Sequence, residues 1–256
     1  MSLHMVIPDA HAYPGDDFER FEMAGEFALK MRPDVIVAMG DWADMPSLCM
    51  YDYGKKVYEG RRYYKDCDAS RTALDHFERP IREYNRGRGK NHKKGYRPRK
   101  VMLIGNHEHR IIKAIEGDSK LDGTISLDDL GYREYGWDVQ PFLIPINIDG
   151  VYYNHYFVSG VMGNPISGEN PSRSIVKKQM ASCTAAHSHI MDAGNAAAPN
   201  GKMVYGLVGG CFFEHSMAFA EAVEHMYWRG VHLCHNVSDG EYDLDSWSMS
   251  RLRKEG

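Results

Sequence analysis

The chain is poor in cysteine and has no long apolar run, and each shortage excludes a class of protein. Its 256 residues include five cysteines, which are scattered, odd in number and never spaced as Cys-x-x-Cys. Thiols in this pattern are typical of a reducing compartment and argue against a disulfide-linked scaffold. No run of about eighteen apolar residues occurs, so a transmembrane helix is not expected. The start, Met-Ser-Leu-His-Met, lacks the regions of a signal peptide, and we therefore expect a cytoplasmic protein.

Charge is distributed unevenly along a chain of otherwise ordinary composition. The apolar fraction of 43% and the lack of repeats or linkers predict a single domain over residues 1–256. The net charge is −4, yet residues 50–100 contain sixteen Lys and Arg against seven Asp and Glu. We interpret residues from about 45 to 100 as an insertion. Its charge fits either a solvated surface or a binding site for a polyanion such as nucleic acid, and the sequence leaves both open.

Apolar patterning predicts an α/β fold. Residues 5–8 and 34–39 read as strands around a helix at 16–31, a βαβ unit whose strands lie parallel. A helix is expected near 69–84. Asp149-Gly150 between two apolar runs is a strong hairpin signal. A βαβ unit followed by later hairpins predicts two packed sheets with flanking helices.

Polar residue types that bind metals follow several of the strand-like runs. They form five motifs in this order: Asp9-Ala-His11, Gly40-Asp41-Trp-Ala-Asp44, Gly105-Asn106-His107-Glu108, His155 and His187-Ser-His189. Strands bring residues from distant parts of a chain to one edge of a sheet, so these side chains could share a site. An extended backbone would point both side chains of Asp-x-His, and of His-x-His, to one face. Oxygen and nitrogen donors without thiolate suit Mn, Fe or Zn.

Each motif alone has an ordinary explanation. Asp-x-His after a strand is usually a capped turn, and Gly-Asp-x-x-Asp usually leads into a helix. A histidine pair is more often a surface loop than a ligand pair, and His155 alone would be a half-buried strand residue. These explanations are hard to sustain together, because the pieces occur in one order and most of them fall at strand ends.

The ordered set resembles the motifs of the calcineurin-like metallophosphoesterase superfamily, including phage-encoded members, and spans residues 9–189. The resemblance implies a four-layer α/β/β/α sandwich of two packed mixed sheets flanked by helices, with two divalent metal ions. Two positions depart from the family pattern. Ala186 precedes the histidine pair where the family usually has Gly. Met45 stands where the protein-phosphatase branch has Arg, which argues against a Ser/Thr protein phosphatase.

The resemblance also implies a role for each site residue. The ligands of the first metal would be Asp9, His11 and His189. Those of the second would be Asn106, His155 and His187. Asp41 would bridge the two ions, for which we expect Mn, with Fe or Zn as alternatives. His107 matches the family's catalytic histidine, and Asp44 matches the acid that orients it.

These residues predict a dinuclear-metal-dependent phosphoesterase in which a metal-bound hydroxide attacks phosphorus in line. The basic, tyrosine-rich insertion favours a phosphodiesterase that acts on nucleic acid or nucleotides. The residues expected to bind polynucleotide are Lys90, Lys93, Lys94, Arg97 and Arg99. One alternative is a small-molecule phosphomonoesterase whose insertion only covers the pocket. A non-catalytic scaffold is disfavoured, because all seven ligand positions, His107 and Asp44 are present. The oligomeric state is not indicated.

Other candidates are weaker. His109 and Arg110 lie beside a motif and are either phosphate contacts or part of a solvated helix face. A zinc site is conceivable from scattered residues of the last third of the chain, namely Cys211, His215, Cys234 and His235. Their irregular spacing favours structural roles instead.

Overall fold

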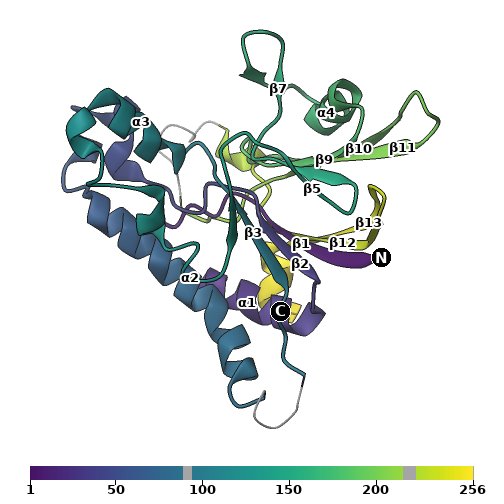
Figure 1. The fold of residues 1–256 in the computed structure, drawn as a ribbon, viewed down its shortest axis with the longest axis horizontal. Helices are drawn as coiled ribbons and strands as arrows, with labels where there is room; N and C mark the ends of the chain where they lie inside the picture. Colours follow the sequence, from purple (N-terminus) through teal and green to yellow (C-terminus); the bar gives the residue numbers. More distant parts are fainter. Residues whose placement is uncertain (89–93, 216–222, 256) are drawn as a thin grey trace.

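The computed structural model describes residues 1–88, 94–215 and 223–255 (Figure 1). Two mixed β-sheets pack face to face between helices, which confirms the predicted fold class. Among the described helices, none is both long enough and apolar enough to span a bilayer.

The first sheet has the strand order β13-β12-β1-β2-β3-β4. Its strands are β1 (Ser2–Ile7), β2 (Val35–Ala38), β3 (Arg99–Leu103), β4 (Asp138–Gln140), β12 (Gly230–Ser238) and β13 (Glu241–Ser248). Strands β1 to β4 are parallel, and β12 and β13 are antiparallel additions. The predicted βαβ unit is confirmed, with α1 (Glu19–Met31) as its helix. The carboxyl ends of β1, β2 and β3 therefore meet at one edge of the sheet.

The second sheet has the order β10-β11-β9-β6-β5. Its strands are β5 (Ile146–Ile148), β6 (Val151–Tyr153), β9 (Ser182–Ala185), β10 (Met191–Ala197) and β11 (Met203–Gly209). The hairpin predicted at Asp149-Gly150 is confirmed by the antiparallel pairing of β5 with β6, although both strands are shorter than expected. Strands β6, β9 and β11 are parallel, so their carboxyl ends also share an edge. A separate short hairpin consists of β7 (Val158–Ser159) and β8 (Asn164–Pro165).

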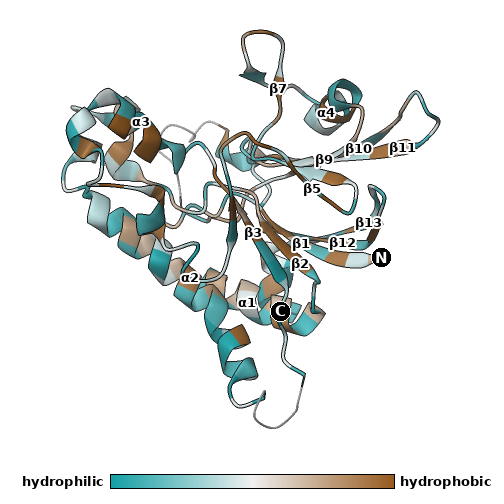
Figure 2. Ribbon diagram, in the orientation of Figure 1, coloured by the Kyte–Doolittle hydropathy of each residue, from teal (hydrophilic) through white to brown (hydrophobic). Residues whose placement is uncertain are grey.

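Alternation along the strands builds the core on both sides of the first sheet. Met5 and Ile7 of β1 pack toward the helical layer, which contains α1, α2 (Tyr63–Asn85) and α5 (Met249–Glu255). Val6, between them, packs against the second sheet, as the two-residue period of a strand requires. Helix α4 (Pro171–Gln179) covers the outer face of the second sheet. Figure 2 shows hydrophobic residues on the central strands and a mostly hydrophilic α2.

The basic insertion is split between the two ends of α2. Three short 3-10 turns precede the helix, at Pro46–Leu48, Met50–Asp52 and Lys56–Tyr58, and lie on the side of α3 (His109–Gly117). Helix α2 has 23 residues, longer than predicted, and so spans about 34 Å. The described parts of the Lys- and Arg-rich segment after it, residues 86–88 and 94–98, lie at the far end, and the second part leads into the start of β3 (Figure 1). Lys90 and Lys93 lie outside the described residues.

Candidate metal centre

The predicted ligands gather where strands of both sheets end. Asp9, Asp41 and Asn106 follow β1, β2 and β3 of the first sheet. His155 and His187 follow β6 and β9 of the second. His11 and His189 each come two residues after a ligand. The edge shared by parallel strands thus brings all seven predicted side chains to one place, while their roles as ligands remain a prediction.

The turns that carry these side chains are tight. The backbone is not extended at Asp-x-His or His-x-His, because φ is 41° at His11, 70° at His187 and 61° at His189. Asp41 is also left-handed, with φ of 50°. Residues other than glycine seldom adopt this conformation, and such strained residues cluster at functional sites. Chain reversal directly after each strand explains why the extended geometry is not found.

Two glycines let the neighbouring turns approach. A Cβ at Gly105 would lie 2.1 Å from Asp41 Oδ1. A Cβ at Gly40 would lie 2.8 Å from both the Gly105 nitrogen and His155 Nδ1. Any larger residue at either position would therefore push apart the turns that present Asp41, Asn106 and His155.

The donor atoms form two clusters that are adjacent through Asp41. In the first, Asp9, His11 and His189 offer ligand atoms within 4.8 Å of one another. The same holds in the second for Asp41, His155 and His187. A third group, His11, Asp41 and His107, satisfies the same distance and overlaps both clusters. Asp41 Oδ2 lies 3.4 Å from His155 Nε2 and 3.8 Å from His11 Nε2, between the clusters. This grouping is the one that two ions sharing Asp41 would require.

Several donor atoms of the clusters are buried and have no hydrogen-bond partner in the described parts of the chain. They are Asp9 Oδ1, His11 Nδ1 and His11 Nε2. An unsatisfied buried polar atom costs about 1–3 kcal/mol, so a fold that keeps three together needs another partner for them. Burial, with His107 nearby, lowers the pKa of His11 to about 4, which leaves a neutral imidazole suited to a cation. The residues present therefore fit divalent metal ions.

The orientation of His155 also suits a ligand. Its Nδ1 lies 2.9 Å from the Met39 carbonyl oxygen, which can only accept a hydrogen bond. Nδ1 therefore carries the proton, and Nε2 faces Asn106 Oδ1 at 2.9 Å. A backbone carbonyl that fixes the outer nitrogen is a common arrangement for metal-binding histidines.

His107 and Asp44 form a buried pair beside the clusters. His107 Nδ1 lies 2.8 Å from Asp44 Oδ1, and His107 Nε2 lies 3.8 Å from Asp41 Oδ2. Burial lowers the pKa of His107, but the carboxylates of Asp41 and Asp44 outweigh it and raise the pKa overall. The pair therefore holds an imidazole that keeps a proton and faces the predicted ligands.

Glu108 has a structural role that the sequence motif did not assign. Its buried carboxylate accepts hydrogen bonds from the backbone N–H groups of Asp41 and Ala43, both at 3.0 Å, and of Gly105 at 2.9 Å. The Tyr132 hydroxyl donates a fourth at 2.9 Å. One side chain thus fixes the turns after β2 and β3 against each other. Its place directly after His107 was the only signal in the sequence.

His215 and Arg110 also lie at the site. Arg110 was one of the weaker candidates from the sequence, whereas His215 was considered only for a zinc site. His215 Nδ1 lies 2.9 Å from Asp16 Oδ2, and its Nε2 lies 3.6 Å from Asp44 Oδ2. Burial opposes protonation, but Asp16 and Asp44 raise the pKa of His215 to about 9. Arg110 donates to the Asp44 carbonyl oxygen at 2.7 Å and lies 3.1 Å from His107 Nε2. The zinc interpretation gains no support, because Cys234 is packed between the sheets.

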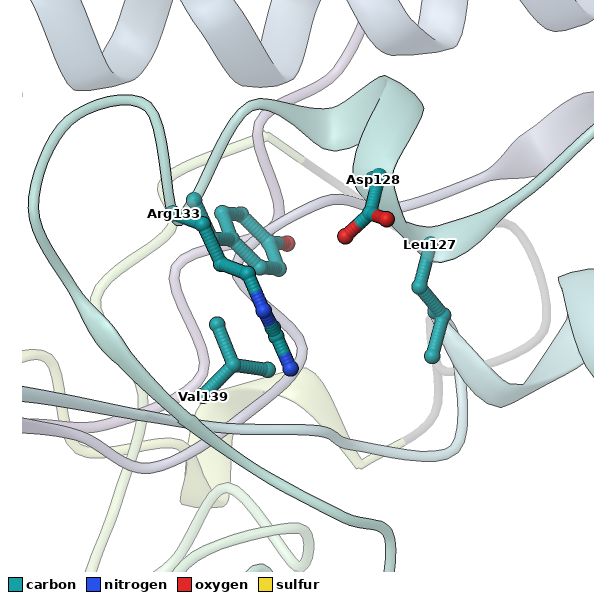
Figure 3. Close-up of a pocket in the computed structure, with 5 residues that line it drawn as sticks. Leu127, Asp128, Arg133 and Val139 are labelled. Atoms are coloured by element: carbon teal, nitrogen blue, oxygen red, sulfur yellow. The ribbon is translucent and has the colours of Figure 1, made fainter.

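A separate pocket lies behind Glu108 rather than at the clusters. Its lining consists of Leu127, Asp128, Tyr132, Arg133 and Val139 (Figure 3). Tyr132 reaches Glu108 from this side. No predicted ligand lines the pocket, so we do not regard it as part of the metal centre.

Comparisons with known proteins give little help. No protein-family model matches the chain, and no curated protein matches it either. Among solved structures, "Yfce, a phosphoesterase from E. coli" is 11% identical, with a TM-score of 0.40 over 95% of this chain and 98% of that one. TT1561 of Thermus thermophilus is also 11% identical, with a TM-score of 0.36 over 96% and 98%. At this distance nothing about activity passes from those proteins to this chain.

Proposed function

We propose that this chain is a dinuclear-metal-dependent phosphoesterase, a hydrolase of phosphoric esters. The observation that supports it most is the pair of adjacent donor clusters around Asp41, with three buried donor atoms that have no hydrogen-bond partner among the described residues. A cluster of this kind without a ligand would be costly, and its donors are those of Mn, Fe or Zn sites.

The chain divides its donors between two ions. One would be held by Asp9, His11 and His189. The other would be held by Asn106, His155 and His187, with Asp41 shared. Two divalent cations, with Mn expected and Fe or Zn as alternatives, would activate a water nucleophile and neutralise the phosphoryl oxygens.

The remaining chemistry belongs to His107 and its neighbours. With Nδ1 bonded to Asp44, His107 Nε2 faces the clusters and lies 3.1 Å from Arg110 Nη2, which can only donate. Once a phosphoryl oxygen takes over that guanidinium, Nε2 can carry a proton and pass it to a departing alkoxide. Arg110 places a guanidinium beside that nitrogen, where it can hydrogen-bond an anionic phosphoryl oxygen. Glu108 keeps the turns that bear Asp41 and His107 in register.

We infer that the substrate is a phosphodiester of nucleic acid or a nucleotide. The exposed cations that precede α2 support this choice, since they lie in the segment that joins Asp44 to that helix. They can bind the phosphates on either side of a scissile diester.

The first test compares hydrolysis of bis(p-nitrophenyl) phosphate with that of p-nitrophenyl phosphate in Mn²⁺, beside an EDTA-treated control. Metal-dependent turnover that prefers the diester is expected. Preference for the monoester would replace the diesterase with a small-molecule phosphomonoesterase. Turnover of neither compound would contradict the proposed activity and favour a non-catalytic scaffold.

A further inference from the structure

The segment between Asp44 and α2 exposes large side chains. Met50 is 80% exposed, Tyr51 87%, Tyr53 72% and Tyr64, in the first turn of α2, 61%. No other aromatic side chain among the described residues is as exposed as the three tyrosines. Large apolar side chains gathered on a surface usually mark a binding site.

Hydrogen bonds within the segment hold the backbone that carries the exposed rings. The Tyr58 hydroxyl donates to the Ser47 carbonyl oxygen at 2.6 Å, and its ring centroid is 5.7 Å from that of Tyr53. Arg61 Nη1 donates to the Pro46 carbonyl oxygen at 3.1 Å and to Asp52 Oδ2 at 2.8 Å. These bonds fix the 3-10 turns, so the rings are held for contact at little further entropic cost.

Free positive charge accompanies the rings. Residues 50–65 contain five Lys and Arg against two Asp and Glu. Lys55, Lys56, Arg62 and Lys65 are exposed. Asp52 pairs with Arg61 at 2.8 Å and with the exposed Lys55 at 3.4 Å, so its one carboxylate is shared between two cations. Exposed rings among exposed cations suit single-stranded polynucleotide, since the bases stack on rings while the phosphates meet the cations.

The segment begins at the candidate site. Tyr51 comes seven residues after Asp44, a separation of at most about 25 Å. The Tyr58 hydroxyl ties the following turn back to Ser47. Arg110, which borders His107, also contacts the Met45 carbonyl oxygen at 3.3 Å. A strand lying on this surface is therefore within reach of the donor clusters.

The described residues of the basic loop at the other end of α2 lack these properties. The ring of Tyr84 is already covered by two guanidinium groups, since Arg32 lies 4.2 Å and Arg88 3.6 Å from its centroid. Tyr96 is buried, and its hydroxyl donates to the Pro33 carbonyl oxygen. The loop also leads into the start of β3, whereas the clusters lie beyond the strand's carboxyl end. The structure thus gives no support to Lys94, Arg97 and Arg99 as the polynucleotide contacts near the site.

We propose that Tyr51, Tyr53, Lys55 and Lys56, here called the aromatic platform, bind single-stranded polynucleotide and present it to the metal centre. The inference rests on the proposed function for what happens to the strand once bound. The occupant is single-stranded because a duplex hides the base faces that the two tyrosines would contact.

Binding can be measured separately from turnover. Fluorescence anisotropy of labelled oligodeoxythymidine and oligouridine is followed in Mn²⁺ with a His107→Asn background, which keeps all seven predicted ligands. Tyr51→Ala with Tyr53→Ala should weaken binding at least about tenfold, while Tyr51→Phe with Tyr53→Phe should retain it. Equal affinity in the alanine pair, or tighter binding of a duplex, would overturn the platform.

Charge variants at the two ends of α2 provide a matched comparison. Lys55→Gln with Lys56→Gln should reduce the slope of log affinity against log salt by about 1.4, the value for two contacts to a single strand. Lys94→Gln with Arg97→Gln removes the same charge at the far end and should change affinity less than about twofold. Equal losses in both pairs would show non-specific attraction and contradict the proposal.

The two proposals fail in different ways. Hydrolysis of the model diester without oligonucleotide binding would overturn the platform and leave the activity standing. Platform-dependent binding without hydrolysis of any diester would contradict the proposed function and leave only the binding surface. Tighter binding of oligouridine or of oligodeoxythymidine identifies the preferred sugar, and either result supports a single-stranded ligand.

Discussion

Two buried histidines lie toward opposite ends of the segment formed by β1 and the turn after it, and their surroundings differ. His4 is fully buried, with Nδ1 2.8 Å from the Tyr153 hydroxyl and Nε2 3.0 Å from Asp149 Oδ2. His11 is equally buried, yet neither of its ring nitrogens has a hydrogen-bond partner among the residues that the structure describes.

The difference is whether the ring nitrogens have hydrogen-bond partners: those of His4 do, and those of His11 do not among the described residues. His4 needs nothing further, and it acts as part of the framework that closes the hairpin of β5 and β6 onto β1. His11 lies beside Asp9 and His189, whose donors also converge on one point. The same residue types thus serve stability at one end of the segment and, on our account, metal binding at the other.

The largest effect is expected from metal removal. Bound ions stabilise the folded state by mass action, by about 4 kcal/mol at a thousandfold excess over Kd, and they relieve the repulsion between Asp9 and Asp41. Chelation should therefore abolish hydrolysis and lower the Tm, and Mn²⁺ should restore both. Thermal unfolding with and without Mn²⁺ checks this. A Tm that does not respond to the metal would contradict the interpretation that the unpartnered donor atoms around His11 bind metal ions.

Loss of the proposed catalytic imidazole, His107, should have the next largest effect. His107→Asn should lower kcat by about 10²–10⁴-fold, because the leaving oxygen loses its proton donor. Metal content should stay that of the wild type, since His107 is not a predicted ligand. Steady-state kinetics together with elemental analysis measure both quantities. Loss of metal along with activity would instead make His107 a ligand.

A smaller effect is expected at His215. Its Nε2 lies on the far side of the Asp44 carboxylate from His107, so His215→Asn should loosen that carboxylate and lower kcat by about tenfold, with KM little changed. The exposed His225→Asn is the matched control and should behave as the wild type. A purely structural role would lower the Tm and leave kcat per folded molecule unaltered.

Substitution of His4 should lower stability and leave the response to metal unchanged. His4→Ala leaves the Tyr153 hydroxyl unsatisfied and should cost about 3 kcal/mol of unfolding free energy. Its stabilisation by Mn²⁺ should equal that of the wild type. Urea denaturation with and without the metal separates the two effects. A smaller response to Mn²⁺ would mean that the two ends of this segment are not independent.

Asp66 tests whether an unpartnered buried atom alone makes a metal site. Its Oδ1 has no hydrogen-bond partner among the described residues, and Asp66 belongs to none of the groups of possible metal ligands found there. Burial raises the pKa of Asp66 from 3.8 to about 6. Because folding favours the protonated form, this carboxyl makes the protein less stable as pH rises from about 4 to 6. Asp66→Asn should stabilise the fold at pH 8 by about 2 kcal/mol and do little at pH 4. Urea denaturation at both pH values measures this, and equal effects at both would contradict it.

Sequence reasoning was strongest where strands end in polar residues. The parallel βαβ unit and the hairpin at Asp149-Gly150 followed from local pattern, and so did the gathering of Asp9, Asp41 and Asn106. Strand β10 was not predicted, because its small residues acquire strand conformation only by pairing with β11. Helix α5 was missed as well.

The features that depend on contacts between distant parts of the chain were not predicted, for one common reason. The left-handed turns at His11 and His187 depend on packing between sheets, which local pattern does not encode. His215 reaches Asp44 only through the folded chain. The charge of the insertion was visible in the sequence, but its division between the ends of α2 was not. Counting residues cannot tell which end of a helix faces a site.

The most direct test of the central claim is the number of metal ions bound per chain. Elemental analysis after equilibration with Mn²⁺ and gel filtration should give two ions in the wild type. The Asp41→Asn variant, which loses the shared carboxylate, should retain at most one. His4→Ala, the control at a histidine whose ring nitrogens are already hydrogen-bonded, should retain two. A wild type that binds no metal, or an Asp41→Asn variant that still binds two ions with unchanged affinity, would contradict the account.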